Sequence, residues 1–436
     1  MTVASQQLSF GQRYAPLAII GLLFFIFGFI TWLNGALIPY LQIICELSEL
    51  QSLFVTFAFY FAYTVMALPM SMVLKRTGYK NGMALGMAIM AVGTLAFIPA
   101  ALSAQYWVFL MALFVVGSGL TIIQTASNPY LVHMGSKERA AMRISIMGLL
   151  NKFAGVIVPV VFTMIVMADL GGITVETVSA LTGEAKQAKV EELSQRLVAP
   201  YLYLAAILAV LVLVIKFSGL PEIEIEEEGS DKSSDSILAH PQAILGAFAL
   251  FCYVGVEVIA GDTIGLYGSK LGLSNFASLT SYTMAFMMIG YVIGVTCIPK
   301  FISQQQALLG SAIAGLLCIV GIILASEQSH GISQVLWGWT GVATIPNSVT
   351  FVALMGLAHA LVWPSVWPLA LDGLGKLTAK GSALLIMGIA GGAILPLVFG
   401  FLVEAYSSMQ LAYIIGLPCY GFILFYALKG HKMRSW

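Results

Sequence analysis

The sequence predicts an all-α integral membrane protein that crosses the bilayer with twelve helices, arranged as two bundles of six. Of its 436 residues, 59% are hydrophobic and only 9% are charged, whereas an average soluble domain has roughly 25% charged residues. The apolar residues gather in runs of roughly twenty, the length that spans a bilayer as a helix. The most polar connector, residues 219–240, separates six of these runs from the other six.

Each expected helix begins where a polar connector gives way to an apolar run. The first run follows Arg13 and, at about thirty residues, is too long for a removable signal peptide, so we expect it to remain as a span. Residues 71–82 (SMVLKRTGYKNG) separate the second and third helices, and residues 169–198 separate the fifth and sixth and could hold a short amphipathic helix. The twelve helices are expected to start near residues 15, 50, 82, 105, 143, 199, 243, 276, 306, 348, 380 and 409.

These boundaries predict an N-terminal six-helix bundle over residues 1–218, a cytoplasmic linker over 219–240 and a C-terminal six-helix bundle over 241–436. The halves carry traces of an internal repeat. Residues 128–159 and 367–396 both read proline, short basic loop, Ile-Met-Gly, glycine, proline. Duplicated halves are a common origin of membrane transport folds.

The positive charges predict the orientation. With both termini in the cytoplasm, four basic residues face the outer side (Lys186, Lys189, Arg196 and Lys270) and Lys152 lies inside the fifth helix, so the other fifteen face the cytoplasm. Basic residues concentrate on the cytoplasmic side of membrane proteins. We therefore expect a multi-pass protein of a bacterial inner membrane with both termini cytoplasmic.

Several classes of chemistry lack support in the sequence. The five cysteines and five histidines show no ligand or disulfide spacing, so we expect neither a metal site nor a cofactor. A formal net charge of +0 suggests no nucleic-acid partner. The chain contains no catalytic nucleophile motif and no ATP-binding loop of the form GxxxxGK[ST]. We therefore expect no enzymatic activity, no catalytic residues and no ATP-driven process.

Two acids lie where hydrocarbon is expected. Glu257 and Asp262 fall in the apolar stretch 244–271 with no basic residue near them in sequence, although an acid at a helix centre costs roughly 2.5–3.5 kcal/mol on insertion scales. Five residues separate them, or about 140° on a regular helix, so a shared site needs a helix break, which Gly261 offers. The alternative to a functional role is a structural ion pair with Lys152, which is itself deep in the fifth helix.

Three sequence motifs resemble those of one transporter family. They are WLNGALIPYL (residues 32–41), QTASNPYL (124–131) and RISIMGLLNKFAG (143–155). With the twelve-helix plan, they resemble the fucose:proton symporter family of the major facilitator superfamily, and the match extends over nearly the whole chain. Within that family, VEVIAGDTIG and the ending GHKMRSW are most similar to bacterial N-acetylglucosamine permeases and glucose/galactose porters.

The resemblance also has informative departures. The fucose symporter carries protonatable acids in its first and fourth helices, but the aligned positions here are Gly35 and Gln124. Neither side chain can carry a proton. If transport is cation-coupled, the titrating groups must lie elsewhere, and we predict Asp262 and Glu257. The asparagine of the fifth helix that the family uses for sugar binding is retained as Asn151.

A sugar site needs hydrogen-bonding side chains and an aromatic plane. The predicted substrate-binding residues are Asn34, Gln124, Asn128, Asn151, Lys152, Tyr253, Glu257, Asp262, Trp363 and Trp367. Each has a structural alternative: the amides can tie helices together, the tryptophans can belong to the interfacial belt, and the charged residues can pair.

The resemblance implies a secondary active sugar importer that works by alternating access. We expect coupling to a proton or a sodium ion, N-acetylglucosamine as substrate or otherwise glucose and galactose, and a monomer whose other partner is the lipid bilayer. A uniporter without cation coupling and a non-transporting sugar sensor are the alternatives. A drug/proton antiporter would share the fold but suits a more apolar pocket.

Overall fold

The computed structural model describes residues 10–133, 140–167, 175–220, 237–298, 300–374 and 377–436. The expected all-α membrane fold is confirmed. The α-helices are α1 (Phe10–Cys45), α2 (Glu49–Ser52), α3 (Phe54–Leu95), α4 (Phe97–Ser103), α5 (Tyr106–His133), α6 (Ala140–Val166), α7 (Val175–Ser179), α8 (Gly183–Gln195), α9 (Val198–Phe217), α10 (Pro241–Lys270), α11 (Thr280–Cys297), α12 (Gln304–Leu324), α13 (Gly331–Trp337), α14 (Asn347–Ala360), α15 (Val362–Leu371), α16 (Thr378–Met387), α17 (Gly391–Tyr406), α18 (Met409–Ala412) and α19 (Gly416–Leu428).

Eleven helical segments in the described part of the chain are long and apolar enough to cross a membrane. The first part of α3 supplies the remaining expected span. With 42 residues, α3 would measure roughly 63 Å as a straight helix, about twice the thickness of the hydrocarbon core. The backbone instead turns at Gly78, whose φ of 77° favours glycine. The second and third predicted helices are therefore the two parts of α3.

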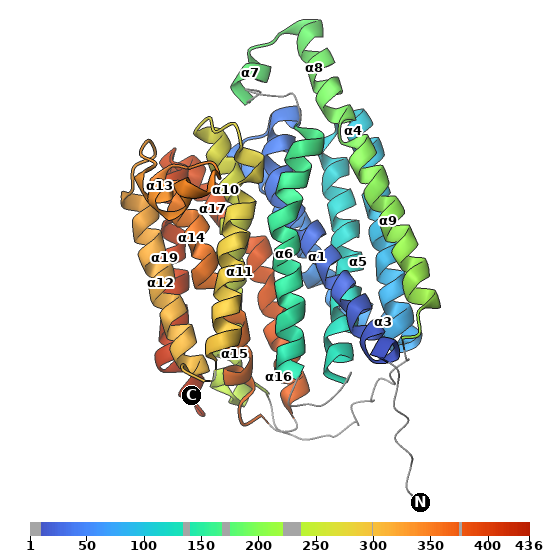
Figure 1. The fold of residues 1–436 in the computed structure, drawn as a ribbon, viewed down its shortest axis with the longest axis vertical. Coiled ribbons are helices and arrows are strands. Elements are labelled where there is room, and N and C mark those ends of the chain that lie inside the picture. Colours follow the sequence, from blue (N-terminus) through green and yellow to red (C-terminus); the bar gives the residue numbers. More distant parts are fainter. Residues whose placement is uncertain (1–9, 134–139, 168–174, 221–236, 299, 375–376) are drawn as a thin grey trace, which may run out of the picture.

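Two groups of helices stand side by side in Figure 1. Helices α1 to α9 (blue to green) form the N-terminal group, and α10 to α19 (yellow to red) form the C-terminal group. The short helix expected within residues 169–198 is present as α7 and α8, which project from one end of the molecule, the α8 end. α1 begins and α19 ends at the opposite end, the terminal end.

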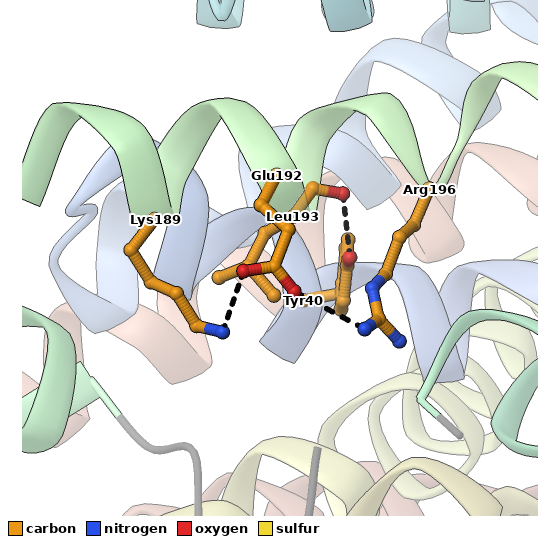
Figure 2. Close-up of polar contacts among 5 residues, drawn as sticks. All are labelled: Tyr40, Lys189, Glu192, Leu193 and Arg196. Carbon is orange, nitrogen blue, oxygen red and sulfur yellow. Dashed lines mark hydrogen bonds and ion pairs between the residues drawn. The ribbon is translucent and has the colours of Figure 1, made fainter. Parts of the chain in front are cut away.

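The projecting helix α8 is fixed to the end of α1. Arg196 and Leu197 form a turn between α8 and α9 and keep right-handed helical backbone angles. There the buried Tyr40 hydroxyl donates a hydrogen bond of 2.7 Å to the Leu193 carbonyl, and Lys189 and Arg196 both bind the Glu192 carboxylate (Figure 2). Tyr40 thus satisfies a carbonyl in the last turn of α8, next to its junction with α9.

The tenth predicted span is interrupted. It consists of α14 and α15, which are separated by Leu361. Pro364 has no N–H to donate to the Ala360 carbonyl, which weakens the helix at this point. The interruption lies beside His359 and Trp363, two side chains of the polar region described below.

Candidate functional site

The boundary between the N-terminal and C-terminal groups of helices is called the seam below. Helix α10 lies on its C-terminal side. Its residues from Cys252 to Ser269 are all buried. Where α10 meets α1, glycines allow close approach: a Cβ at Gly35 would lie 2.1 Å from the Thr280 hydroxyl, and one at Gly261 would lie 2.4 Å from the Trp32 ring. An aspartate at position 35 would not fit this contact.

The expected break at Gly261 is wrong, because α10 is one uninterrupted helix. Gly261 is needed instead for close packing against Trp32, and its carbonyl accepts a hydrogen bond from Thr280. The two acids therefore do not share one site. Separated by about 140° around the helix and about 7.5 Å along it, Glu257 binds Lys152 and Asp262 binds Thr56.

Glu257 and Lys152 form a buried ion pair between the two groups. The Lys152 Nζ lies 2.7 Å from Glu257 Oε1, with only 10% and 9% of the two side chains exposed. The ammonium also lies over the Trp32 ring, 4.2 Å from its centroid. A cation on an aromatic face gains further electrostatic stabilisation. The structural ion pair considered for Lys152 is present, and it crosses from α6 to α10.

Asp262 has a different environment. It is fully buried, and its Oδ2 accepts a hydrogen bond of 2.9 Å from the Thr56 hydroxyl on α3. Its Oδ1 has no hydrogen-bond partner, and no basic side chain in the described part of the chain forms an ion pair with this carboxylate. A buried carboxylate in this state gains by binding a proton or a cation.

Aromatic residues form a continuous strip next to the ion pair. Tyr253, one turn before Glu257 on α10, interacts electrostatically with that carboxylate. Its ring lies 6.3 Å from that of Trp363, which lies 5.6 Å from that of Trp367. The predicted residues Lys152, Glu257, Tyr253, Trp363 and Trp367 thus come together at one place.

The predicted amides are dispersed. Asn151 accepts a hydrogen bond from the Trp32 indole, which places it beside the ion pair. Gln124 donates one of 3.1 Å to the Tyr63 hydroxyl. Asn34 is buried and lines a cavity of about 20 Å³ inside the N-terminal group, together with Tyr201. Asn34 is therefore not brought to the seam. The side chain of Asn128 lies outside the described residues.

Four residues of the seam are not among the site residues predicted from the sequence. They are Trp32, Thr56, Tyr60 and His359. Tyr60 lies close enough to Asp262 and Glu257 for both carboxylates to act on it electrostatically. The spacing of Thr56, Tyr60 and Tyr63 along one helical face carries a signal for this role, whereas nothing in the sequence around His359 distinguishes it from a packing residue.

Five polar contacts join the two groups within the described residues, and all lie at mid-depth or toward the α8 end. Two were given above: Lys152 to Glu257 and Thr56 to Asp262. The other three are Ser281 to the Val156 carbonyl at 2.6 Å, Lys270 to Glu49 at 2.8 Å and Ser48 to Glu404 at 2.9 Å. The seam is therefore closed at the α8 end in this conformation.

A membrane fold of two helix groups that meet at a buried, charged seam has the architecture of a secondary transporter. The chain belongs to the Major Facilitator Superfamily, whose sequence profile matches residues 20–395. The expected resemblance to the fucose:proton symporter family is confirmed by the comparisons that follow.

Two kinds of relative match the chain over nearly its full length. A protein of Brucella abortus named glucose/galactose transporter is 33% identical, covering 99% of this chain and 97% of its own. The L-fucose-proton symporter of Escherichia coli is 26% identical, covering 94% and 92%. The solved structure of FucP, a Major Facilitator Superfamily transporter in the outward conformation, has a TM-score of 0.71 at 23% identity, covering 97% and 99%. At this level of sequence identity, the similarity to FucP shows a shared fold.

Proposed function

We propose that this protein is a proton-coupled sugar importer and that Asp262 is its proton-binding group. The observation that carries the proposal is the state of this carboxylate, which is fully buried, accepts one hydrogen bond from Thr56 and forms no ion pair among the described residues. Glu257, by contrast, is already neutralised by Lys152. Of the two acids predicted from the sequence, Asp262 is thus the better suited to take up and release a proton.

A sugar is the substrate that the relatives and the seam both favour. The names of the relatives specify glucose, galactose and fucose, and proton coupling is part of the fucose symporter's name. The seam offers charged and amide hydrogen-bonding groups beside a strip of aromatic rings, which suits the hydroxyls and the apolar face of a pyranose. Glucose and galactose are the first substrates to test. N-acetylglucosamine rests on sequence resemblance alone.

The Asp262 contact suggests how a proton is coupled to movement. The Thr56–Asp262 hydrogen bond joins α3 of one group to α10 of the other. A change in the relative arrangement of the two groups passes through a conformation that excludes water from the seam. A charged Asp262 is costly to bury in that conformation, and protonation removes most of that cost. We infer that the protonated carboxyl permits the two groups to change their relative arrangement around the sugar.

The orientation of the protein gives this scheme a direction. The positive-charge pattern favours a cytoplasmic terminal end, as expected above. The α8 end, where the seam is closed, then faces outward. The structure corresponds in this proposal to a conformation from which substrate is released to the cytoplasm of a bacterium.

Uptake and counterflow in proteoliposomes test the proposal. Wild-type protein should accumulate labelled glucose or galactose under an imposed inward proton gradient and should ignore a sodium gradient. Asp262→Asn should abolish gradient-driven accumulation but retain sugar counterflow, because the amide mimics the protonated carboxyl. Asp372→Asn, which removes an exposed acid at the terminal end, is the control and should behave as wild type.

Three outcomes would contradict the proposal. Retained proton-driven accumulation in Asp262→Asn would exclude Asp262 as the coupling group. Counterflow by wild type together with uptake that ignores every cation gradient would favour a uniporter. Sugar binding without any flux would favour a sensor.

A further inference from the structure

His359 is a buried side chain whose polar atoms are left unsatisfied. It lies on α14 with none of its surface exposed, and neither Nδ1 nor Nε2 has a hydrogen-bond partner among the described residues. An imidazole always presents at least one N–H donor, and in its neutral form the other nitrogen is an acceptor. Buried polar groups are nearly always paired, so these two nitrogens point to a missing partner.

The surroundings of His359 belong to the seam. Its ring lies 6.1 Å from that of Tyr253 in an edge-on arrangement and 6.0 Å from that of Tyr420, nearly parallel to it. It also lies close enough to Lys152 for the ammonium to act on it electrostatically. His359 therefore extends the aromatic strip of Tyr253, Trp363 and Trp367 on the side nearest the ion pair.

Unsatisfied groups lie at both ends of this strip. The Trp367 indole N–H is buried without a partner among the described residues, and so is the Tyr420 hydroxyl next to His359. Tyr253 and Trp363 lie between them, joined by ring contacts. Aromatic rings with free hydrogen-bonding atoms beside them suit a pyranose, whose apolar face lies within a ring of hydroxyls.

We propose that His359 is a substrate-specificity residue of the sugar site, with one of its ring nitrogens hydrogen-bonded to a sugar hydroxyl. The proposal rests on the proposed function and adds a residue that neither the sequence motifs nor the relatives' names identify. A site built to pair a hydroxyl discriminates against an analogue that lacks it, because its own polar atoms are then left unpaired.

Sugar counterflow tests this proposal, because counterflow needs no gradient and does not depend on the role of Asp262. The substrates are the transported sugar and its monodeoxy analogues, each lacking one hydroxyl. His359→Phe keeps the ring packing and removes both nitrogens. It should raise the KM for the parent sugar about tenfold while leaving the maximal rate within about twofold.

The analogue that lacks the contacted hydroxyl supplies the decisive comparison. Its KM should already be raised in wild type and should rise no further in His359→Phe, whereas the other analogues should lose affinity as the parent sugar does. His359→Gln, which keeps a donor and an acceptor, should give an intermediate KM and serves as the second variant if the phenylalanine variant folds poorly.

His431 offers a matched control. It is also buried in the C-terminal group, but its Nδ1 contacts the Tyr426 carbonyl at 2.9 Å, away from the strip. His431→Phe should leave the KM ratios among the analogues unchanged. Equal losses for every analogue in His359→Phe, or an unchanged KM in both His359 variants, would overturn the proposed contact. Absence of sugar counterflow in wild type would instead overturn the proposed function, and this inference with it.

Discussion

The Lys152–Glu257 ion pair allows a direct test of whether Glu257 serves transport or only stability. The perturbations are Lys152→Met, Glu257→Gln and the double variant. The two charged atoms lie 2.7 Å apart and about nine-tenths of each side chain is buried. Removing one partner of such a pair costs about 3–5 kcal/mol, because the other charge is left buried and uncompensated.

The surroundings predict which single variant is less stable. In Glu257→Gln the Lys152 ammonium retains its contact with the Trp32 ring, 4.2 Å from the centroid, which is worth about 2 kcal/mol where water is excluded. The new amide oxygen can still accept a hydrogen bond from the ammonium. The loss for this variant should fall near 3 kcal/mol. In Lys152→Met the carboxylate lies near Tyr253 and Tyr291 but pairs with no other cation among the described residues, so the loss should approach 5 kcal/mol. The double variant removes both charges of the pair and should recover about half of that loss.

The assay measures free energies of unfolding in detergent, together with sugar counterflow for each variant. We expect the double variant to be folded but inactive, because it lacks two groups that we propose bind the sugar. The exposed pair Glu49 and Lys270, which joins the same two helix groups, is the control, and its removal should cost below about 1 kcal/mol. Wild-type counterflow in the double variant would refute a transport role for both residues. Losses under about 1 kcal/mol in both single variants would refute the energetic reasoning.

Three further predictions concern the remaining contacts of the seam and of α8. Gly35→Ala should lower stability by about 1–3 kcal/mol, because its Cβ would lie 2.1 Å from the Thr280 hydroxyl; an unchanged melting temperature would contradict this contact. Tyr40→Phe should cost about 1 kcal/mol and speed tryptic cleavage at the α8–α9 junction, and equal cleavage rates would count against its anchoring role. Burial alone raises the pKa of Glu49, but the hydrogen bond and charge of Lys270 outweigh it and hold that pKa below the ordinary 4.5. Stabilisation by this pair is therefore complete above pH 4.5 and lost as the pH falls below it; spin-label distances across the α8 end should increase there in wild type but show no such transition in Glu49→Gln.

Most of the fold could be predicted from the sequence because a bilayer imposes strict rules on composition. A span must be apolar and about twenty residues long, so the helix starts near 199 and 409 follow from counting residues alone. The turn between the second and third helices follows from a basic, glycine-containing loop, and Gly78 indeed adopts a conformation that favours glycine. The interruption near Pro364 follows equally from the missing N–H of proline.

The site was only partly predictable, because its partners come from distant segments. Nothing in a linear sequence indicates that Lys152 meets Glu257, 105 residues away, or that Thr56 meets Asp262 across 206 residues. The sequence suggested that Gly261 breaks its helix, since glycine is common at such breaks. The structure shows close packing against Trp32 instead, a contact that depends on the arrangement of two helices.

By itself the sequence determined a twelve-helix membrane protein with two costly acids in its seventh span, because hydrophobicity and charge act on each helix separately. Only the tertiary structure decided that these acids have different surroundings. Side chains that reach α10 from α6 and α3 give Glu257 a cation, whereas Asp262 receives a hydroxyl and, among the described residues, no cation. The charge state that a buried acid favours depends on its partners in space, and those partners are fixed by how the helices pack.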